Sequence, residues 1–181
     1  MIYLMLANGF EEIEAVTVVD LLRRADIQIK TASIMDEKLV YGAHGMALEA
    51  DIMFKEIDFT TCTMAVLPGG MPGTMNLCNY KPLAEELLEL RRKNKPVAAI
   101  CAAPMVLGRL GILKGKRATI YDGMEDELAG ADIIKKQNVV IDGDVITSRG
   151  PGTAIEFALA IIGFLKGPDK ASEIRSDILY R

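Results

Sequence analysis

Short apolar runs alternate with amphipathic segments along most of this chain, and this alternation limits the folds open to it. The amphipathic segments have the spacing of α-helices, with apolar residues three and four positions apart. A strand, a helix and a second strand in this order pair in parallel through a right-handed crossover. The chain is therefore predicted to form an α/β fold, with a mostly parallel sheet and helices on both of its faces. The predicted strands are residues 2–6, 27–34, 64–67 and 97–100, and the first helices are 11–25 and 81–94.

Two regions depart from this alternation. Residues 36–53 mix short strand-like runs with turn signals, which predicts a small β-hairpin beside the main sheet. His44 lies between two glycines there and is expected to be an exposed turn residue. Asp142-Gly143-Asp144 separates two apolar runs and predicts a second hairpin. A further strand is expected at 118–121, and helices are expected at 154–165 and 170–179.

The first predicted helix begins with acidic residues, and its apolar residues suggest which face packs inward. The residues expected to face the core are Ile13, Val16, Val19 or Asp20, and Leu22. Glu11, Glu12 and Glu14 suit the positive end of the helix dipole, which is explanation enough for their presence. Which of these three carboxyl groups points inward is left open, although Glu14 lies one turn further from the loop than Glu11.

Length and composition are those of one globular domain spanning residues 1–181. A net charge of -4 without a basic patch argues against nucleic-acid binding. No apolar run reaches the length of a membrane span, and residues 1–6 lack the basic start of a signal peptide, so a cytoplasmic location is expected. Cys62, Cys78 and Cys101 show no metal-binding spacing and are expected to be free thiols. With one histidine in the chain, no metal is expected.

Cys101 stands between a buried strand and a helix with almost no loop. The strand is predicted to end at Ile100, and Pro104 suits the first turn of the helix that follows. A side chain on so tight a turn is exposed over the amides that open the helix, as in a nucleophile elbow. Those amides are expected to lower the thiol pKa. The alternative is a cysteine that simply fills the core.

Three such features fall at the same edge of the predicted sheet, where ligands bind in open α/β folds. They are the acidic turn after the first strand, Pro68-Gly69-Gly70 after the third, and Cys101. A thiolate of Cys101 would be the nucleophile, and the amides of Gly70 and Ala102 would hold an oxyanion or an oxidised sulfur. A buried carboxyl group facing the sulfur would be protonated and could donate a hydrogen bond to it.

Several motifs along the chain match one known family. They are 9–16, 20–25, Leu67-Pro-Gly-Gly70, Ala98-Ala-Ile-Cys-Ala-Ala-Pro104 and 147–153. With these motifs the chain resembles the ThiJ/PfpI superfamily over nearly its whole length, and it looks most similar to the branch of the Parkinsonism-associated deglycase and its bacterial YajL-type relatives. The resemblance implies a flavodoxin-like three-layer α/β sandwich that forms a homodimer. It also implies that Cys101 is the reactive, easily oxidised cysteine, that Glu14 is its protonated partner, and that Gly70 and Ala102 are amide donors.

The sequence departs from the superfamily pattern at two positions. Ala102 stands where protease-like members have a histidine, which argues against a Cys-His peptidase. Tyr121 stands where some nearer relatives have a histidine, and His44 lies in the region that approaches the subunit interface in relatives. Gly69, Tyr121 and His44 are therefore further candidates for the site.

The resemblance implies two functions that share this site. The first is a glyoxalase or deglycase that acts on methylglyoxal or early glycation adducts through Cys101 and needs no metal or organic cofactor. The alternative is a stress chaperone and redox sensor, in which Cys101 is oxidised to sulfenate or sulfinate without turnover. A small amide or ester is a third possible substrate. The roles of Cys62 and Cys78 are left open.

Overall fold

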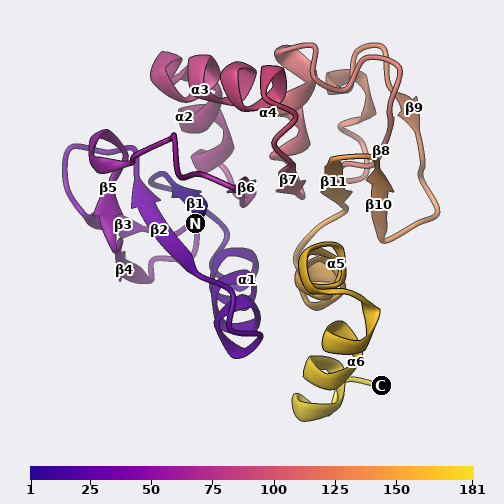
Figure 1. The fold of residues 1–181 in the computed structure, drawn as a ribbon. Helices are drawn as coiled ribbons and strands as arrows, with labels where there is room; N and C mark the ends of the chain where they lie inside the picture. The colour runs from indigo at the N-terminus through magenta and orange to yellow at the C-terminus, as the bar shows by residue number, and fades with distance from the viewer.

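A seven-stranded sheet forms the centre of the computed structural model, which describes residues 1–181 (Figure 1). Its strand order is β10-β11-β7-β6-β1-β2-β5, and every neighbouring pair is parallel except β10 and β11. The predicted α/β fold and the predicted hairpin at 142–144 are therefore confirmed. The strands are β1 (Ile2–Leu6), β2 (Ile29–Ser33), β5 (Ile52–Met53), β6 (Met64–Leu67), β7 (Val97–Ile100), β10 (Val139–Asp142) and β11 (Val145–Ser148).

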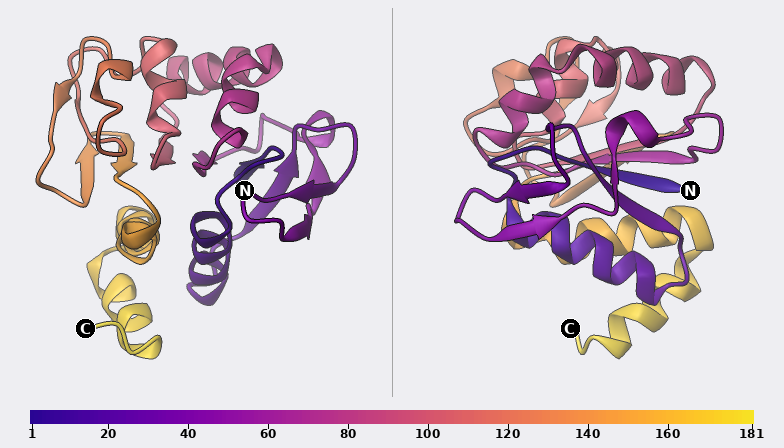
Figure 2. Two further views of the ribbon diagram at one scale, coloured as in Figure 1. Left: turned by 180° about the vertical axis from the view of Figure 1, so that it is seen from behind. Right: turned by 90° about the vertical axis from the view of Figure 1, so that its left-hand side faces the viewer.

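Helices cover both faces of this sheet, giving three layers (Figure 2). One face carries α1 (Glu12–Arg24), α5 (Ala154–Lys166) and α6 (Pro168–Asp177), and the other carries α2 (Gly73–Asn79), α3 (Lys81–Arg92) and α4 (Pro104–Arg109). All residues of β1, β6, β7 and β11 are buried, because each of these strands is covered on both faces. Successive side chains therefore enter opposite cores: Leu4 packs on the α1 and α5 side, and Met5 on the α3 and α4 side.

The strand order predicts where a ligand would bind, at the carboxyl end of β1. The chain leaves β1 toward β2 on one side and later returns to form β6 on the other side. Helical connections on opposite sides of such a switch point leave a crevice at the carboxyl ends of the strands. The segments that follow β1, β6 and β7 meet at this edge, and they contain Glu14, Gly69 and Cys101.

The expected excursion at 36–53 is present as a hairpin of β3 (Leu39–Tyr41) and β4 (Ala47–Glu49), with His44 in its turn. The expected strand at 118–121 is much shorter: β8 (Arg117–Ala118) pairs with β9 (Asp132–Ile133) outside the main sheet. The apolar pattern there reflects burial of Ile120 in a loop rather than strand pairing. Helix α2 was not predicted. The remaining short elements are the 3₁₀ turns η1 (Phe54–Glu56), η2 (Glu125–Glu127) and η3 (Pro151–Thr153).

The expected packing face of α1 is right at Leu22, which is buried, and wrong at its start. Ile13 is 55% exposed and Val16 is 45% exposed, whereas Glu14 and Val18 are buried. The first turns of the helix are oriented so that their carboxyl groups reach the loops after β1 and β6. This orientation leaves two apolar side chains exposed on the outside of the helix.

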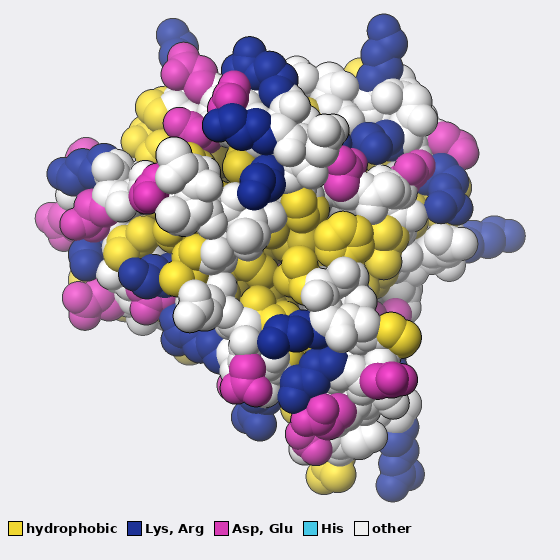
Figure 3. Space-filling view, in the orientation of Figure 1, with side chains coloured by type: hydrophobic (Ala, Val, Ile, Leu, Met, Phe, Trp, Pro, Cys, Tyr) yellow, Lys and Arg dark blue, Asp and Glu magenta, His cyan; other side chains and the backbone are white.

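The surface charges and the helix lengths concern the expectations about nucleic-acid binding and membrane spans. On the face shown in Figure 3, Lys and Arg side chains are interspersed with Asp and Glu around an apolar centre and form no basic patch. None of the helices combines the length and the apolar character needed to cross a membrane.

Candidate functional site

The turn after β7 places Cys101 at the crevice. Cys101 follows the strand directly and has a φ of 62°, a left-handed conformation that non-glycine residues seldom adopt. Its backbone is held on both sides, since its N–H donates to the Ser148 carbonyl at 2.9 Å and its carbonyl accepts from the Tyr121 N–H at 2.9 Å. The side chain is largely buried, with 9% of the residue exposed. The tight strand-to-helix turn expected from the sequence is therefore present.

Gly69 lies against both Cys101 and Glu14. Its N–H donates to Glu14 Oε2 at 2.7 Å. A Cβ atom added to Gly69 would lie 2.6 Å from Cβ of Cys101 and 2.8 Å from Oε2 of Glu14, so any side chain there would overlap both. The neighbouring Gly70 has a φ of 91° and packs against the backbone of Gly9 and Glu11. The segment after β6 thus needs glycine in order to bring the carboxyl group to the sulfur.

Glu14 is completely buried, with 0% of the residue exposed. Only one of its carboxyl oxygens has a hydrogen-bond partner in the protein, since Oε1 is buried and has none. Burial raises the pKa of Glu14 to about 7, against the smaller opposing effects of the hydrogen bonds from Gly69 and Cys101. A carboxyl group with this pKa is partly protonated near neutral pH and can both accept and donate a proton.

The expected lowering of the Cys101 pKa is wrong. Burial raises the pKa of the Cys101 thiol to about 12, and the negative charge of Glu14 adds to this effect. The amides of Ala102 and Gly70 act in the expected direction, but their effect is smaller. Because α4 has only six residues, the dipole at its start is short as well.

Cys101 and Glu14 therefore form one proton-exchanging unit. The pair loses its first proton near pH 7 and its second near pH 12. Between these pH values it holds a single proton, which either the sulfur or the carboxyl group of Glu14 can carry. When the proton moves to Glu14, the sulfur becomes a thiolate next to the amides of Gly70 and Ala102. Such a pair can attack an electrophile and return the proton to the product.

Glu11 and Glu12 were interpreted as helix-start residues, but both are buried beside the hairpin turn. Glu12 Oε1 accepts from the N–H of His44 at 2.8 Å, and Oε2 lies 3.0 Å from His44 Nδ1. Burial would raise the pKa of Glu12, but these bonds and that of Met46 hold it below its usual value. The hydrogen bond to Glu12 raises the pKa of His44. In the sequence, the only sign of this cluster is the run of carboxyl groups at the ligand-binding edge.

The structure does not bring His44 or the Tyr121 side chain into contact with the sulfur. His44 has an exposed side chain and lies on the far side of Glu11 and Glu12. Tyr121 is half exposed and reaches the site through its backbone. Its ring packs against Gly150 at the rim of a cavity of 230 Å³. Cys62 and Cys78 are free thiols elsewhere in the protein.

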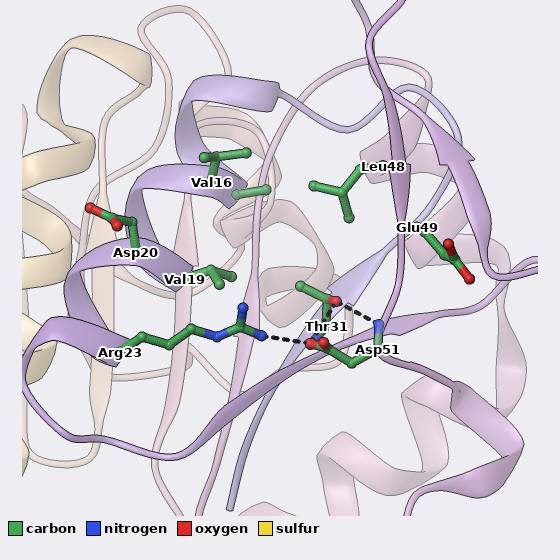
Figure 4. Close-up of a pocket in the computed structure, with 9 residues that line it drawn as sticks. Val16, Val19, Asp20, Arg23, Thr31, Leu48, Glu49 and Asp51 are labelled. Atoms are coloured by element: carbon green, nitrogen blue, oxygen red, sulfur yellow. Dashed lines mark hydrogen bonds and ion pairs between the residues drawn. The ribbon is translucent and has the colours of Figure 1, made fainter.

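Another cavity, of 380 Å³, opens between α1, β2 and the β4 strand of the hairpin (Figure 4). Val16, Val19 and Leu48 form its apolar wall, and Arg23 crosses its floor to Asp51 at 2.8 Å. Neither Cys101 nor Glu14 lines it. Its lining carries no group suited to covalent chemistry.

Comparison with known proteins agrees with the fold described above. The DJ-1/PfpI family model matches residues 1–163. The chain is 36% identical to the protein DJ-1 homolog B of Arabidopsis thaliana over 97% of its own length, but it spans only 40% of that relative. It is 37% identical to the glutathione-independent glyoxalase DJR-1.2 of Caenorhabditis elegans, covering 91% of this chain and 87% of that protein.

A solved structure gives the same result. The oxidized DJ-1 of Toxoplasma gondii superimposes with a TM-score of 0.94 at 34% identity, covering 99% of this chain and 97% of that one. The shared fold therefore extends from the first strand to the last helix, and the resemblance seen in the sequence motifs is confirmed. By its sequence and its structure, this chain belongs to the DJ-1/PfpI family.

Proposed function

We propose that this protein is a cofactor-independent glyoxalase that also acts on early glycation adducts, with Cys101 as nucleophile and Glu14 as proton carrier. One observation carries the proposal: the buried Oε1 of Glu14 has no protein partner and belongs to a carboxyl group whose pKa is about 7. A base of this kind suits proton transfer at neutral pH. The similarity to a glyoxalase of C. elegans supports the same substrate class.

The reaction with methylglyoxal divides into three steps. Sγ of Cys101 attacks the aldehyde carbon while Glu14 takes the thiol proton, and the carbonyl oxygen is protonated to give a hemithioacetal. Glu14 then moves a proton from the former aldehyde carbon to the neighbouring carbon, while the hydroxyl proton passes to the neighbouring carbonyl oxygen. These two proton transfers convert the hemithioacetal into a lactoyl thioester. Water hydrolyses this thioester, so methylglyoxal and water become lactate and the thiol is restored.

The amides of Gly70 and Ala102 supply the electrostatic part of this mechanism. Both interact with the sulfur of Cys101. When the sulfur forms a bond to a carbonyl carbon, the charge develops on an oxygen one bond away, and fixed N–H donors near that position stabilise it. Burial of the site strengthens the interaction, because little water competes for the donors.

The test is methylglyoxal consumption with lactate detection on the reduced protein. Cys101→Ser should abolish lactate formation, and Glu14→Gln should lower kcat by about two to four orders of magnitude, the usual worth of a proton-transfer group. Cys78→Ser is the matched control, because it removes a more accessible thiol away from the site. Carbonyl loss that stops at one molecule per chain, without lactate, would reduce the reaction to simple trapping and refute turnover.

A redox-sensing chaperone is the second candidate, and the same two amides favour it. N–H donors next to the sulfur would stabilise the oxygen of a sulfenate or sulfinate, and a protonated Glu14 would donate a further hydrogen bond. Mild peroxide should then add oxygen to Cys101 before Cys78, as seen by peptide mass spectrometry. Preferential oxidation without lactate formation would favour this function over the first.

We also propose that the protein forms a homodimer through the outer face of α1. Ile13 and Val16 are exposed on this helix, and Tyr41 and Met46 are exposed on the neighbouring hairpin. Val16 also lines the cavity of Figure 4, and a second copy of the chain would cover these exposed apolar side chains. A two-fold contact of this kind uses the same surface on both subunits.

A further inference from the structure

Glu11, Glu12 and His44 bring three potential metal ligands together at the edge of the crevice. Each offers one ligand atom, and these atoms all lie within 4.8 Å of one another. Nδ1 of His44 is 3.0 Å from Oε2 of Glu12 and 3.5 Å from Oε2 of Glu11. The two carboxyl groups come from the start of α1, and the imidazole comes from the β3–β4 turn.

These separations are those of atoms arranged around one ion. Ligand atoms at about 2.0–2.1 Å from a tetrahedral Zn²⁺ lie roughly 3.3 Å from each other. The distances from Nδ1 to the two carboxylate oxygens bracket this value. An ion could therefore replace the proton between His44 and the carboxylates with little rearrangement.

Glu11 supplies an independent reason to expect a ligand. Its side chain is nine-tenths buried, yet its carboxylate accepts no hydrogen bond from the protein. Its contact with Nδ1, at 3.5 Å, is longer than an ordinary N–H···O bond. The only ion pair of Glu11 is this contact with His44, so its carboxylate is free to coordinate a cation beside Nδ1. By contrast, Glu12 is satisfied by the hairpin turn, which holds it in place.

We propose that Glu11, Glu12 and His44 bind a divalent transition-metal ion of the Zn²⁺ class. Two carboxylates and one imidazole form a mixed oxygen and nitrogen set that suits Zn²⁺ better than Mg²⁺ or Ca²⁺, which take oxygen ligands. The His44 side chain is 71% exposed in the single chain, at the edge of the surface proposed to bind a second copy, and the three protein ligands leave one coordination position open. Three protein ligands and one open position are typical of a site that exchanges its fourth ligand.

The site lies next to the Cys101 pair without including it. The N–H of Glu11 donates to the Gly69 carbonyl at 2.9 Å, and Gly69 in turn contacts both Cys101 and Glu14. The charge of Glu11 also helps to raise the pKa of Glu14.

The experiment titrates Zn²⁺ into the metal-free, reduced protein at neutral pH and follows binding by calorimetry. One ion per chain is expected. His44→Ala and Glu11→Gln should each weaken binding by more than about tenfold, since even the outer partners of metal ligands contribute that much. Glu49→Gln is the matched control, because it removes one exposed carboxylate from the same hairpin and should leave the affinity unchanged.

Co²⁺ in place of Zn²⁺ separates this site from the thiols. The visible spectrum of bound Co²⁺ should show four- or five-coordinate bands without a thiolate-to-metal charge-transfer band, and Cys101→Ser should leave it unchanged. Binding that survives His44→Ala, or that carries the thiolate band, would overturn the assignment. No saturable binding up to about millimolar Zn²⁺ would overturn it too. Neither measurement depends on glyoxalase turnover, so the two proposals fail separately.

Discussion

The buried carboxyl group of Glu14 should leave a clear mark on the pH dependence of stability. The perturbation is Glu14→Gln, which keeps the size of the side chain and its acceptor for the Gly69 N–H. The substitution removes the ionisable carboxyl group and changes no other charge. The quantity to compare is the free energy of unfolding of the variant minus that of the wild type, measured at a series of pH values.

The magnitude follows from the two pKa values of the carboxyl group. Glu14 titrates at about 7 in the folded protein and at the ordinary value of 4.5 in the unfolded chain. The folded state therefore binds more protons between these values, and the wild type loses stability as the pH rises from 4.5 to 7. The full difference corresponds to about 3 kcal/mol. Below pH 4.5 the neutral carboxyl group carries no such penalty.

Urea unfolding from pH 4.5 to 8.5 provides the measurement, with both proteins in the same buffers. Other titrations, including that of His44 with Glu12, cancel in the difference between the two proteins. The variant should gain about 3 kcal/mol relative to the wild type between the acid and alkaline ends. Glu49→Gln, which removes an exposed carboxylate, should give a flat difference. A flat difference for Glu14→Gln as well would refute a neutral-pH proton carrier at this position.

Three further predictions address the same region. Gly69→Ala should lower the free energy of unfolding by about 1–3 kcal/mol, because the added Cβ atom would overlap Cys101 and Glu14. Gly152→Ala is the control: its added Cβ atom meets nothing within 4 Å and should leave the melting temperature unchanged. Equal effects of the two substitutions would contradict the contact at Gly69. The rate of Cys101 alkylation by iodoacetamide should increase through pH 7, as the Cys101–Glu14 pair loses its first proton. In Glu14→Gln this increase in rate should move to above pH 9, because burial alone then raises the thiol pKa. Peptide mass spectrometry would report the rates, and identical pH–rate profiles for the two proteins would argue against proton exchange between Cys101 and Glu14. Val16→Asp should convert the dimer into a monomer in sedimentation experiments, because it places a charge among the exposed apolar side chains of α1. A molecular mass equal to that of the wild type would place the subunit interface elsewhere.

The sequence predicted the sheet well because its central strands are buried on both faces. Such strands appear as continuous apolar runs, and β6 and β7 were found to the residue. The edge of the sheet at which Glu14, Gly69 and Cys101 meet followed from the order of strands and helices alone. The loops that bring them into contact require only short local turns.

What the sequence did not predict depends on side-chain burial that no periodic pattern reports. The orientation of the start of α1 was wrong because its inward face carries Glu12 and Glu14 where a helix normally buries apolar residues. The thiol pKa was wrong because the burial of Cys101 outweighs two amides, and the extent of burial is known only from the packing. The bond between Glu12 and the His44 turn joins segments 32 residues apart, and nothing in either segment indicates the other.

The left-handed backbone conformation of Cys101 indicates that the fold itself does not require a cysteine at this position. At a φ of 62°, glycine or asparagine would fold more readily, and a cysteine costs about 1–3 kcal/mol. Asp26 and Asn94, which share this conformation, are residue types that tolerate it through their short polar side chains. Cys101 has no such reason to be there. A descendant of this protein that kept the fold but lost the chemistry would be free to replace this cysteine with glycine. That single substitution would indicate the loss of activity more reliably than a low overall sequence identity.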